Sequence, residues 1–186
     1  LTFLIFPQLV EDLTGQSFET YLRQHIYDPL GLDSLVFRPA LKYPRESIVP
    51  TELDTLYRHE LTRGWVHDEN ASLMGGVSGN AGLFSTAEDL GVLMQLYANY
   101  GSLNGKQILE PTIVKEFARA QFPENENRRG LGFDKPLLNN AQLELTEAYP
   151  APAVSQDSFG HRGFTGTFVW ADSVNQLVYI FLSNRV

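Results

Sequence analysis

The distribution of apolar and polar residues predicts helices in the first two thirds of the chain and strands near its end. Residues 2–13 are mostly apolar and do not alternate, which favours a buried helix with a local disturbance at Pro7 and a stop at Gly15. Residues 17–26 follow with the amphipathic pattern of a second helix. Ser17 is its expected N-cap, because a side-chain hydroxyl can accept a free backbone N–H at a helix start.

Pro29 and Gly31 are expected to end this second helix. Ser85-Thr-Ala-Glu88 matches a capping box and predicts another helix, which Gly101 stops. Glu110-Pro111 opens a further helix, since proline is favoured in the first helical turn. The expected buried stripes are Leu90, Leu93, Met94 and Tyr97 in the former, and Ile113, Val114, Phe117 and Ala118 in the latter.

The last third of the chain carries the strand signals. Residues 128–133 suggest a short strand, and residues 136–158, rich in Pro, Asn and Ala, a long loop. Phe164–Ala171 and Leu177–Leu182 are predicted strands joined by the turn 172–176. The second strand is apolar at nearly every position, so we expect both of its faces to be covered, as in a central strand.

Length and composition fit one soluble globular domain: 186 residues, of which 43% are hydrophobic and 19% charged. The formal net charge of -8 and the lack of clustered Lys and Arg argue against nucleic acid as a partner. The absence of cysteine excludes disulfides, Cys-zinc sites and a Cys nucleophile. The apolar start of the chain is too short for a membrane span and does not resemble a signal peptide.

The densest glycine cluster, Gly75–Gly82, invites a catalytic interpretation. Gly76-Val-Ser78-Gly-Asn80 approaches a nucleophile elbow, but Asn80 replaces the last glycine and a poor strand precedes it. A phosphate loop would need a lysine, which the cluster lacks. We therefore favour a tight loop whose glycines allow close backbone packing before the Ser85 helix.

His67-Asp-Glu69 supplies part of a metal site at most, because such sites need three or four ligands at workable spacing. A polar turn or helix cap is the favoured interpretation, and we expect neither metal nor cofactor. The most suggestive segment is Gly160–Thr167. There His161, beside Gly163 and Gly166, would offer a hydrogen-bonding group next to bare backbone, where a substrate carboxylate or acyl group could lie. A surface histidine at a strand start is the alternative.

Several of these segments resemble the class C beta-lactamase-related, penicillin-binding-protein-like serine hydrolases. Residues 75–90 resemble the stretch before the long helix of that family, and residues 159–167 its third motif, Lys-Thr-Gly or His-x-Gly. Residues 15–22, together with residues 29–33, resemble the segment after its Tyr motif. Residues 48–52 and 128–134 resemble one bacterial branch, in which this domain follows a beta-N-acetylglucosaminidase domain.

The resemblance implies acyl transfer by a serine, assisted by a lysine three residues later and by a tyrosine. His161 takes the position of the third-motif lysine, as an auxiliary catalytic group, and Gly163 that of its glycine. Arg162 stands where a small Thr or Ser is usual. Arg162, Gly163, Phe164 and Thr165 are the expected substrate-binding residues, because the third-motif strand holds the substrate and contributes to the oxyanion hole.

The catalytic serine motif itself is missing from the sequence. Ser102 and Lys106 miss the Ser-x-x-Lys spacing by one residue, and Tyr97-Ala-Asn99 copies the family's Tyr-x-Asn only by coincidence, since Tyr97 belongs to a buried stripe. We therefore expect residues 1–186 to be a single partial domain, the C-terminal portion of the family fold. The expected class is α+β, a fragment of the beta-lactamase/transpeptidase-like fold with an antiparallel sheet flanked by helices. The nucleophile segment and the closing C-terminal helix would be absent.

The parent protein is then expected to hydrolyse an amide or ester, of the cell-wall peptide or beta-lactam type, in the bacterial periplasm or outside the cell. The chain alone is expected to be inert and, lacking part of its own domain, prone to self-association. The alternative is a non-catalytic domain that binds cell-wall material or supports a neighbouring glycosidase. Arg162 favours that alternative.

Overall fold

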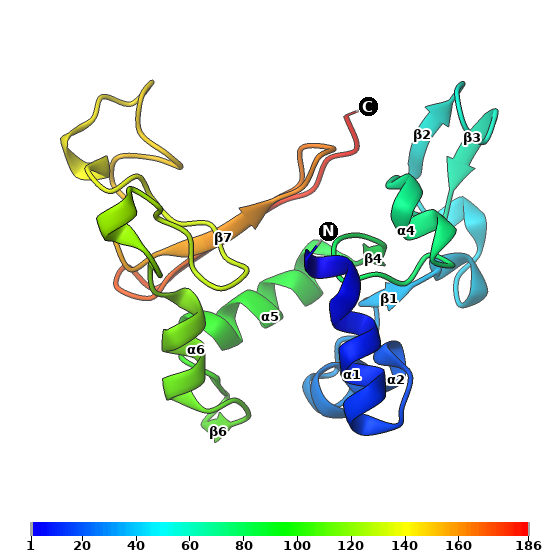
Figure 1. The fold of residues 1–186 in the computed structure, drawn as a ribbon, viewed down its shortest axis with the longest axis horizontal. Coiled ribbons are helices and arrows are strands. Elements are labelled where there is room, and N and C mark those ends of the chain that lie inside the picture. Colours follow the sequence, from blue (N-terminus) through cyan, green and yellow to red (C-terminus); the bar gives the residue numbers. More distant parts are fainter. Residues whose placement is uncertain (1, 186) are drawn as a thin grey trace. The chain divides into compact units, whose positions relative to one another are not determined.

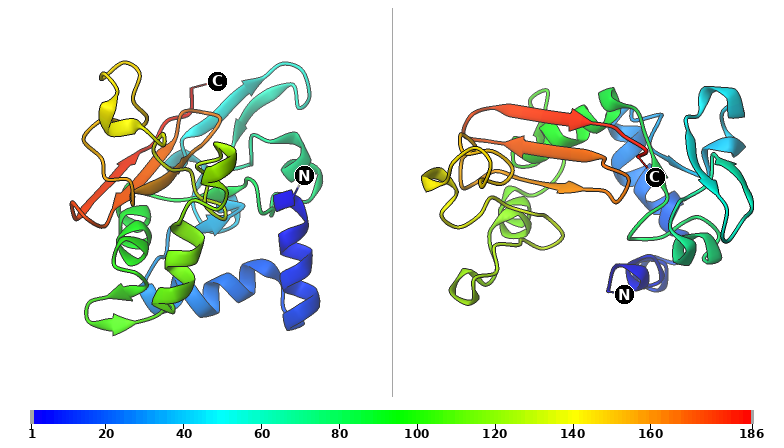
Figure 2. Two further views of the ribbon diagram at one scale, coloured as in Figure 1. Left: turned by 60° about the vertical axis from the view of Figure 1, so that its left-hand side comes forward. Right: turned by 90° about the horizontal axis from the view of Figure 1, so that it is seen from above.

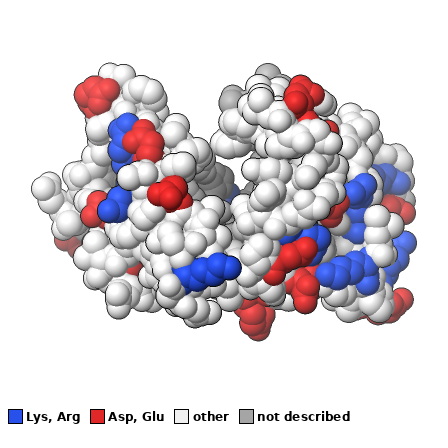
Figure 3. All heavy atoms as spheres, turned by 90° about the horizontal axis from the view of Figure 1, so that it is seen from below, with Lys and Arg blue, Asp and Glu red and all other residues white. Residues whose placement is uncertain are grey.

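The computed structural model describes residues 2–185. The chain forms two compact units, Leu1–Asp89 with Asn184–Val186, and Leu90–Ser183. Each combines helices with small antiparallel sheets (Figure 1), which confirms the predicted α+β class. Acidic and basic side chains are intermixed on the face shown in Figure 3. Within residues 2–185, no helix combines the length and apolar character needed to cross a membrane.

The first unit is mainly helical. Its helices are η1 (Thr2–Ile5), α1 (Phe6–Thr14), α2 (Phe18–Leu22), the π-helical turn η2 (Arg23–Tyr27), α3 (Asp28–Leu30), η3 (Pro39–Leu41), η4 (Arg45–Ser47) and α4 (Glu69–Leu73). Its strands form the antiparallel pairs β1 (Val36–Phe37) with β4 (Leu83–Phe84), and β2 (Pro50–Asp54) with β3 (Glu60–Arg63). Its buried apolar residues include Leu32, Leu35, Phe37 and Val66.

Local signals placed the ends of these helices well. The Ser17 hydroxyl caps α2 by accepting the Thr20 N–H at 3.2 Å, and Gly15 ends α1 at a left-handed φ of 70°. The helical path continues past Pro29, because that residue lies in the first turn of α3, where no N–H is required. Gly31 then ends it at a φ of 69°, so only the second of the two expected stop signals acts.

Three helix predictions were wrong in detail. In the helix that Glu110-Pro111 opens, Ile113 and Phe117 of the expected buried stripe are 56% and 46% exposed. Pro7 lies in the first turn of α1 and does not disturb it. We expected a buried helix here, but Pro7 is the only buried residue of α1. The α5 helix (Ala87–Ala98) is capped by Thr86 and not by Ser85: the Thr86 hydroxyl accepts the Asp89 N–H at 3.4 Å. The Asp89 carboxylate in turn accepts the N–H and hydroxyl of Ser34, both at 2.7 Å, which fixes the start of the helix.

The second unit is built on a three-stranded antiparallel sheet. Its elements are the rest of α5, the hairpin of β5 (Ser102–Leu103) and β6 (Lys106–Gln107), α6 (Pro111–Ala118), η5 (Pro123–Asn125), η6 (Asn140–Gln142), β7 (Phe159–Arg162), β8 (Phe168–Asp172) and β9 (Leu177–Phe181). The sheet order is β7-β8-β9, and α5 and α6 lie against one of its faces (Figure 2). The buried core between them consists of Met94, Ala98, Ala118, Phe159 and Ala171.

The strand predictions needed more correction. No strand covers residues 128–133; only Asp134 forms an isolated bridge, to Gly160. The strand expected from Phe164 begins at Phe168, because residues 163–167 form a hairpin turn in which the Gly163 N–H donates to Thr167 O at 2.7 Å. The preceding strand β7 was not predicted.

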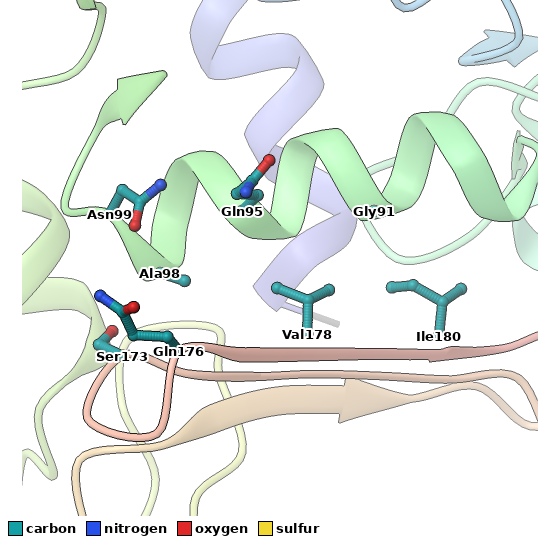
Figure 4. A pocket seen from close by; sticks show the side chains of 8 residues that line it. All are labelled: Gly91, Gln95, Ala98, Asn99, Ser173, Gln176, Val178 and Ile180. Carbon is teal, nitrogen blue, oxygen red and sulfur yellow. The ribbon is translucent and has the colours of Figure 1, made fainter. Parts of the chain in front are cut away.

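The predicted coverage of both faces of β9 was also wrong. Val178 and Ile180 face α5 (Figure 4), whereas Leu177, Tyr179 and Phe181 are 53%, 52% and 51% exposed. The reason is the position of β9 at the outer edge of this sheet, where the helices of the unit cover only one face.

Candidate active site

The segment with the third-motif resemblance forms the strand β7 and the turn that follows it. His161 is the third residue of this strand and pairs with Val169 of β8. Gly160 precedes it at a point of very close packing, because a Cβ there would lie 2.1 Å from Val169 O and 2.9 Å from Trp170 Cα. The need for glycine at position 160 comes from a neighbouring strand, so it could not be recognised from the local sequence.

The imidazole of His161 is exposed, and its contacts define its tautomer. Nδ1 lies 2.8 Å from the carbonyl oxygen of Arg162, which can only accept a hydrogen bond, so Nδ1 carries the proton. In the neutral ring Nε2 is then an acceptor, and it lies 3.5 Å from Nη1 of Arg129. The ring is thus held between the β7 backbone and a guanidinium from another segment.

That other segment runs alongside β7 and is anchored by Asp134. The Asp134 N–H donates to Gly160 O at 2.7 Å, and the Gly160 N–H donates to Asp134 O at 3.0 Å. The Asp134 side chain is 1% exposed and lies 2.9 Å from Arg128 Nη2 and 3.8 Å from Arg129 Nη2. One buried carboxylate therefore holds two arginines beside His161.

Tyr149, from the long loop 136–158, completes this cluster. The guanidinium carbons of Arg128 and Arg162 lie 5.2 and 5.6 Å from the centre of its ring, within cation–π distance. Burial, together with the nearby Asp134 charge, raises the pKa of the Tyr149 hydroxyl to about 12, so the phenol stays neutral. Sequence reasoning missed Tyr149, because a loop without periodicity gives no sign of what its side chains contact.

Lys135 adjoins the cluster but is directed inward. Its ammonium donates to the carbonyl oxygens of Asp157 and Ser158 at 3.3 and 3.1 Å. Burial lowers the pKa of Lys135, and the Asp157 charge opposes this shift only in part. Lys135 therefore ties the end of the long loop to its beginning.

The remaining expected substrate-binding residues lie in the β7–β8 turn. Phe164 is 84% exposed at its tip. The Thr165 hydroxyl donates to Ser183 O at 3.0 Å, so this hydroxyl already has an acceptor. Gly166 has a φ of +95°, which explains the glycine there. His161 and Arg162 thus form the end of β7, and Gly163, Phe164 and Thr165 continue directly into the turn.

The other motifs proved structural. The Ser78 hydroxyl is buried and donates to Asn80 Oδ1 at 2.6 Å, in the tight loop that we favoured over a nucleophile elbow. Asp68 caps α4 by accepting the Ala71 N–H at 2.8 Å, which confirms the helix-cap interpretation. His67 Nε2 lies 3.3 Å from a Glu52 oxygen. Across residues 2–185 no group of three or more His, Cys, Asp or Glu side chains is arranged to hold a metal ion.

A polar groove lies between α5 and β9 in the second unit (Figure 4). Its lining residues are Gly91, Gln95, Ala98, Asn99, Ser173, Gln176, Val178 and Ile180. It adjoins β9, at the edge of the sheet opposite β7. The groove is therefore separate from the cluster beside β7, which consists of Arg128, Arg129, Asp134, Tyr149, His161 and Arg162.

Comparison with known proteins identifies the family. The family model described as "Beta-lactamase" matches residues 1–186. The chain belongs to the Beta-lactamase family. A family relative from Escherichia coli, named "Putative D-alanyl-D-alanine carboxypeptidase", is 35% identical over 98% of this chain and 43% of its own length. One of the same name from Salmonella paratyphi B is 34% identical over 98% of this chain and 44% of its own length. The chain thus spans less than half the length of these relatives.

Solved structures agree on the family fold. A penicillin-binding protein homolog from Caulobacter crescentus matches with a TM-score of 0.60 and 19% identity, over 96% of this chain and 49% of its own. A beta-lactamase from Mycobacterium bovis matches with a TM-score of 0.59 and 19% identity, over 98% of this chain and 54% of its own. At this identity the likeness concerns the fold, and it confirms the predicted beta-lactamase/transpeptidase-like class.

Proposed function

We propose that this chain is part of a serine hydrolase that transfers the acyl group of an amide or ester, with D-alanyl peptides of the cell wall as the first substrates to test. The observation that carries the proposal is the third-motif sequence His161-Arg162-Gly163 at the end of an outer strand, in a chain of the Beta-lactamase family. The names of the Escherichia coli and Salmonella relatives support the substrate class.

The geometry of β7 suits an extended substrate. Successive residues of a strand direct their backbone groups to alternate sides. The backbone of Gly160 faces the Asp134 segment, so that of Arg162 also faces away from β8. We propose that the substrate lies along this side of β7 against Arg162, with the Arg162 N–H aimed at the developing oxyanion, and that Gly163, Phe164 and Thr165 of the adjoining turn border the bound substrate.

The reaction proposed is a two-step exchange at the acyl carbon. A serine oxygen forms a bond to that carbon, and the amine or alcohol leaves with a proton. Water then attacks the acyl-enzyme, which releases the acid and restores the serine. No serine of residues 1–186 has a lysine three residues later. We therefore propose that the nucleophile, its lysine and the tyrosine belong to a segment outside residues 1–186. On this proposal residues 1–186 are a partial domain, which also lacks the closing C-terminal helix.

Two finer assignments are part of the proposal. The resemblance of residues 48–52 and 128–134 supports the branch in which this domain follows a glucosaminidase domain. A substrate in the cell wall would place the protein in the bacterial periplasm or outside the cell. Fractionation of the source cells with an antibody against residues 1–186 tests the second assignment, and recovery in the cytoplasmic fraction would contradict it.

The decisive experiment compares the full-length protein with residues 1–186 alone. We expect the full-length protein to release D-alanine from a D-alanyl-D-alanine peptide and to form an acyl adduct with a chromogenic cephalosporin, detected by mass spectrometry. The isolated chain should do neither, since without nucleophile and base only weak binding remains. An adduct on any serine of residues 1–186 would refute the proposal that the nucleophile lies outside this chain. A full-length protein that shows neither turnover nor an adduct would refute the proposed hydrolase function.

Arg162 favours one alternative, a non-catalytic domain that binds cell-wall material or supports a neighbouring glycosidase. A bulky cation in the middle of the third motif would obstruct the hydrogen bonding that a small hydroxyl normally provides there. This alternative expects saturable binding of cell-wall peptides by the full-length protein without turnover. Substitution of Arg162 by Thr should then create no activity.

We also propose that residues 1–186 alone self-associate. Three half-exposed apolar side chains, Leu177, Tyr179 and Phe181, line one face of the outer strand β9. An outer strand with an apolar face favours pairing with another chain. Light scattering of the isolated chain should show oligomers that Tyr179→Lys disperses, and a monodisperse monomer would contradict the proposal.

A further inference from the structure

The polar groove between α5 and β9 contains hydrogen-bonding side chains that the fold does not use (Figure 4). Gln95 and Asn99 of α5, and Gln176 of the turn between β8 and β9, make no side-chain hydrogen bond to any of residues 2–185. The hydroxyl of Ser173, on the same turn, is buried and also lacks a partner there. A buried hydroxyl without a partner costs folding free energy, and rotation about one side-chain bond can turn it toward a ligand in the groove. These four groups are therefore available to a ligand.

The helical wall of the groove is unusually bare at its middle. Residues four apart share one side of a helix, so Gly91, Gln95 and Asn99 form one stripe along α5. A Cβ at Gly91 would have no neighbouring atom within 4 Å, so packing among residues 2–185 does not require the glycine. Glycine in a helix interior is destabilising relative to alanine. Its bare backbone instead leaves room for a ligand to lie close to the helix.

The opposite wall is apolar and is joined to a fixed turn. Val178 and Ile180 point from β9 toward α5 (Figure 4). The buried Asp172 carboxylate holds the turn by accepting the N–H groups of Val174 and Asn175, both at 3.1 Å. The polar residues of the turn are thus positioned before a ligand arrives, which lowers the entropic cost of binding.

The chemistry of the lining indicates an uncharged ligand. The groove has a volume of about 700 Å³, within the range of about 300–1,000 Å³ that is typical of small-molecule sites. None of its eight lining residues is charged. A charged ligand would lose water there without gaining a counter-charge. The amide side chains both donate and accept hydrogen bonds, and hydroxyl groups are suited to them because a hydroxyl also does both.

We propose that this groove binds an uncharged saccharide. Its hydroxyl groups bond to the three amides and to Ser173, while the C–H face of a sugar ring covers Val178 and Ile180. A neutral peptide suits the groove less well. Peptides that add to a strand bond to its backbone, whereas the polar groups here belong to side chains of a helix and a turn. Such a site is independent of the proposed hydrolase reaction, because it lies at the edge of the sheet opposite β7.

Calorimetric titration of the full-length protein with two uncharged trimers, of β-1,4-linked N-acetylglucosamine and of β-1,4-linked glucose, tests the proposal. We expect saturable binding of at least one trimer. Gln95→Met removes the hydrogen bonds of a side chain of similar length and should weaken binding roughly two- to tenfold, the usual loss for a neutral hydrogen bond. Gly91→Leu should abolish binding and raise Tm, because leucine occupies the groove and is the better helix former. Gln142→Met, at an exposed glutamine of η6, is the matched control.

The possible results distinguish this site from the proposed hydrolase function. The titration measures binding, so it stays informative if the wild-type protein turns over no D-alanyl peptide, and any such turnover should be unchanged in Gly91→Leu. Binding that Gly91→Leu and Gln95→Met lower, and Gln142→Met does not, supports the proposal. Binding of neither trimer, equal losses in all three variants, or preferential binding of an uncharged peptide, acetyl-trialanine amide, would overturn it.

Thermal unfolding of the same variants supplies the remaining control. If another segment of the full-length protein fills the groove, Gly91→Leu will lower Tm and neither trimer will bind, which also overturns the proposal. If Gly91→Leu does not fold, Gln95→Met decides, because its position is exposed and its circular dichroism should match that of the wild type. Unchanged binding in a folded Gln95→Met variant would then contradict a saccharide site in this groove.

Discussion

Asp134 and Gly160 exchange two backbone hydrogen bonds, of 2.7 and 3.0 Å, and thereby join a loop segment to the strand that carries His161. The pairing is a single isolated bridge and not a continuous strand. It nevertheless brings the Asp134 carboxylate, and with it Arg128 and Arg129, to the side of β7 that faces away from β8. The candidate site therefore depends on the close approach of two backbones at one glycine.

Gly160→Ala should destabilise the full-length protein by about 1–3 kcal/mol, the usual cost of overpacking a filled interior. A methyl group there would lie 2.1 Å from Val169 O, which belongs to the backbone and cannot rotate away. Gly163→Ala is the matched control in the same hairpin, because its Cβ would lie 3.4 Å from Thr167 Cβ, an ordinary contact. Urea unfolding measures both, and equal losses would contradict this account of Gly160.

Asp134→Asn should destabilise the protein by about 1–3 kcal/mol, because it leaves Arg128 beside a buried neutral amide. The Asp134 side chain is 1% exposed, whereas that of Arg128 is 29% exposed, so the loss should stay below that of a wholly buried ion pair. Glu116→Gln breaks an exposed pair with Arg119 and should change stability far less. Thermal unfolding of the two variants gives the comparison, and a larger effect of Glu116→Gln would be inconsistent with it.

Stability should fall in acid partly through Asp172. Burial alone would raise the pKa of this carboxyl, but hydrogen bonds from the Ser155 N–H and hydroxyl and from Asn175 lower it below its usual range. A lowered pKa in the folded state stabilises the protein above the unfolded value of about 3.9, and this stabilisation disappears as the pH falls through the folded value. The free energy of unfolding should therefore decrease below about pH 4.

Asp172→Asn should flatten that acid dependence, while Glu147→Gln, at an exposed carboxylate of the long loop, should leave it unchanged. Urea unfolding at a series of pH values from neutral to acid measures the slope for each variant. An unchanged slope in Asp172→Asn would mean that other carboxylates account for the acid sensitivity.

Helix boundaries were the most predictable part of the fold, because capping depends on a few adjacent residues. Ser17 and Gly15 act as expected, and the error at Ser85 amounts to one residue. Strand β7 was not predictable in the same way. Its sequence, Phe-Gly-His-Arg, shows no alternation, and it is a strand because Val169 and Trp170 lie opposite. Non-local partners of this kind leave no trace in local periodicity.

The candidate site likewise contains some residues that the local sequence reveals and others that only the structure reveals. His161, Arg162 and Gly163 could be named in advance, since they are consecutive and match a motif. Tyr149 lies 13 residues before Arg162 in a loop without periodicity, and its contact with that arginine depends on how the loop folds back. The gathering of Arg128 and Arg129 around the Asp134 carboxylate likewise becomes visible only in the tertiary structure.

The last prediction concerns His161. Its ring is fixed by Arg162 O at Nδ1 and approached by Arg129 at Nε2, on the strand that holds the substrate in the proposed function. Because Nδ1 keeps its proton toward Arg162 O, Nε2 can accept a proton or a hydrogen bond from the substrate or the proton relay once its long contact of 3.5 Å with Arg129 gives way, as an auxiliary to the family's lysine and tyrosine. In the full-length protein, His161→Ala should lower kcat/KM for a D-alanyl-D-alanine peptide roughly ten- to a thousandfold, about 1.4–4 kcal/mol of transition-state stabilisation.

His161→Lys should recover part of the activity, because the family places a lysine at this position. His25→Ala, at an exposed histidine whose ring is tilted against that of Tyr21 in the first unit, is the control for loss of a histidine as such. If His161 only fills the end of a strand, both alanine variants will match the wild-type kcat/KM while remaining folded. A loss of kcat/KM that is confined to His161→Ala and partly restored by His161→Lys would show that the side chain at this position acts on the substrate. A purely structural loss would depend on the shape of the side chain, and lysine does not have the shape of an imidazole.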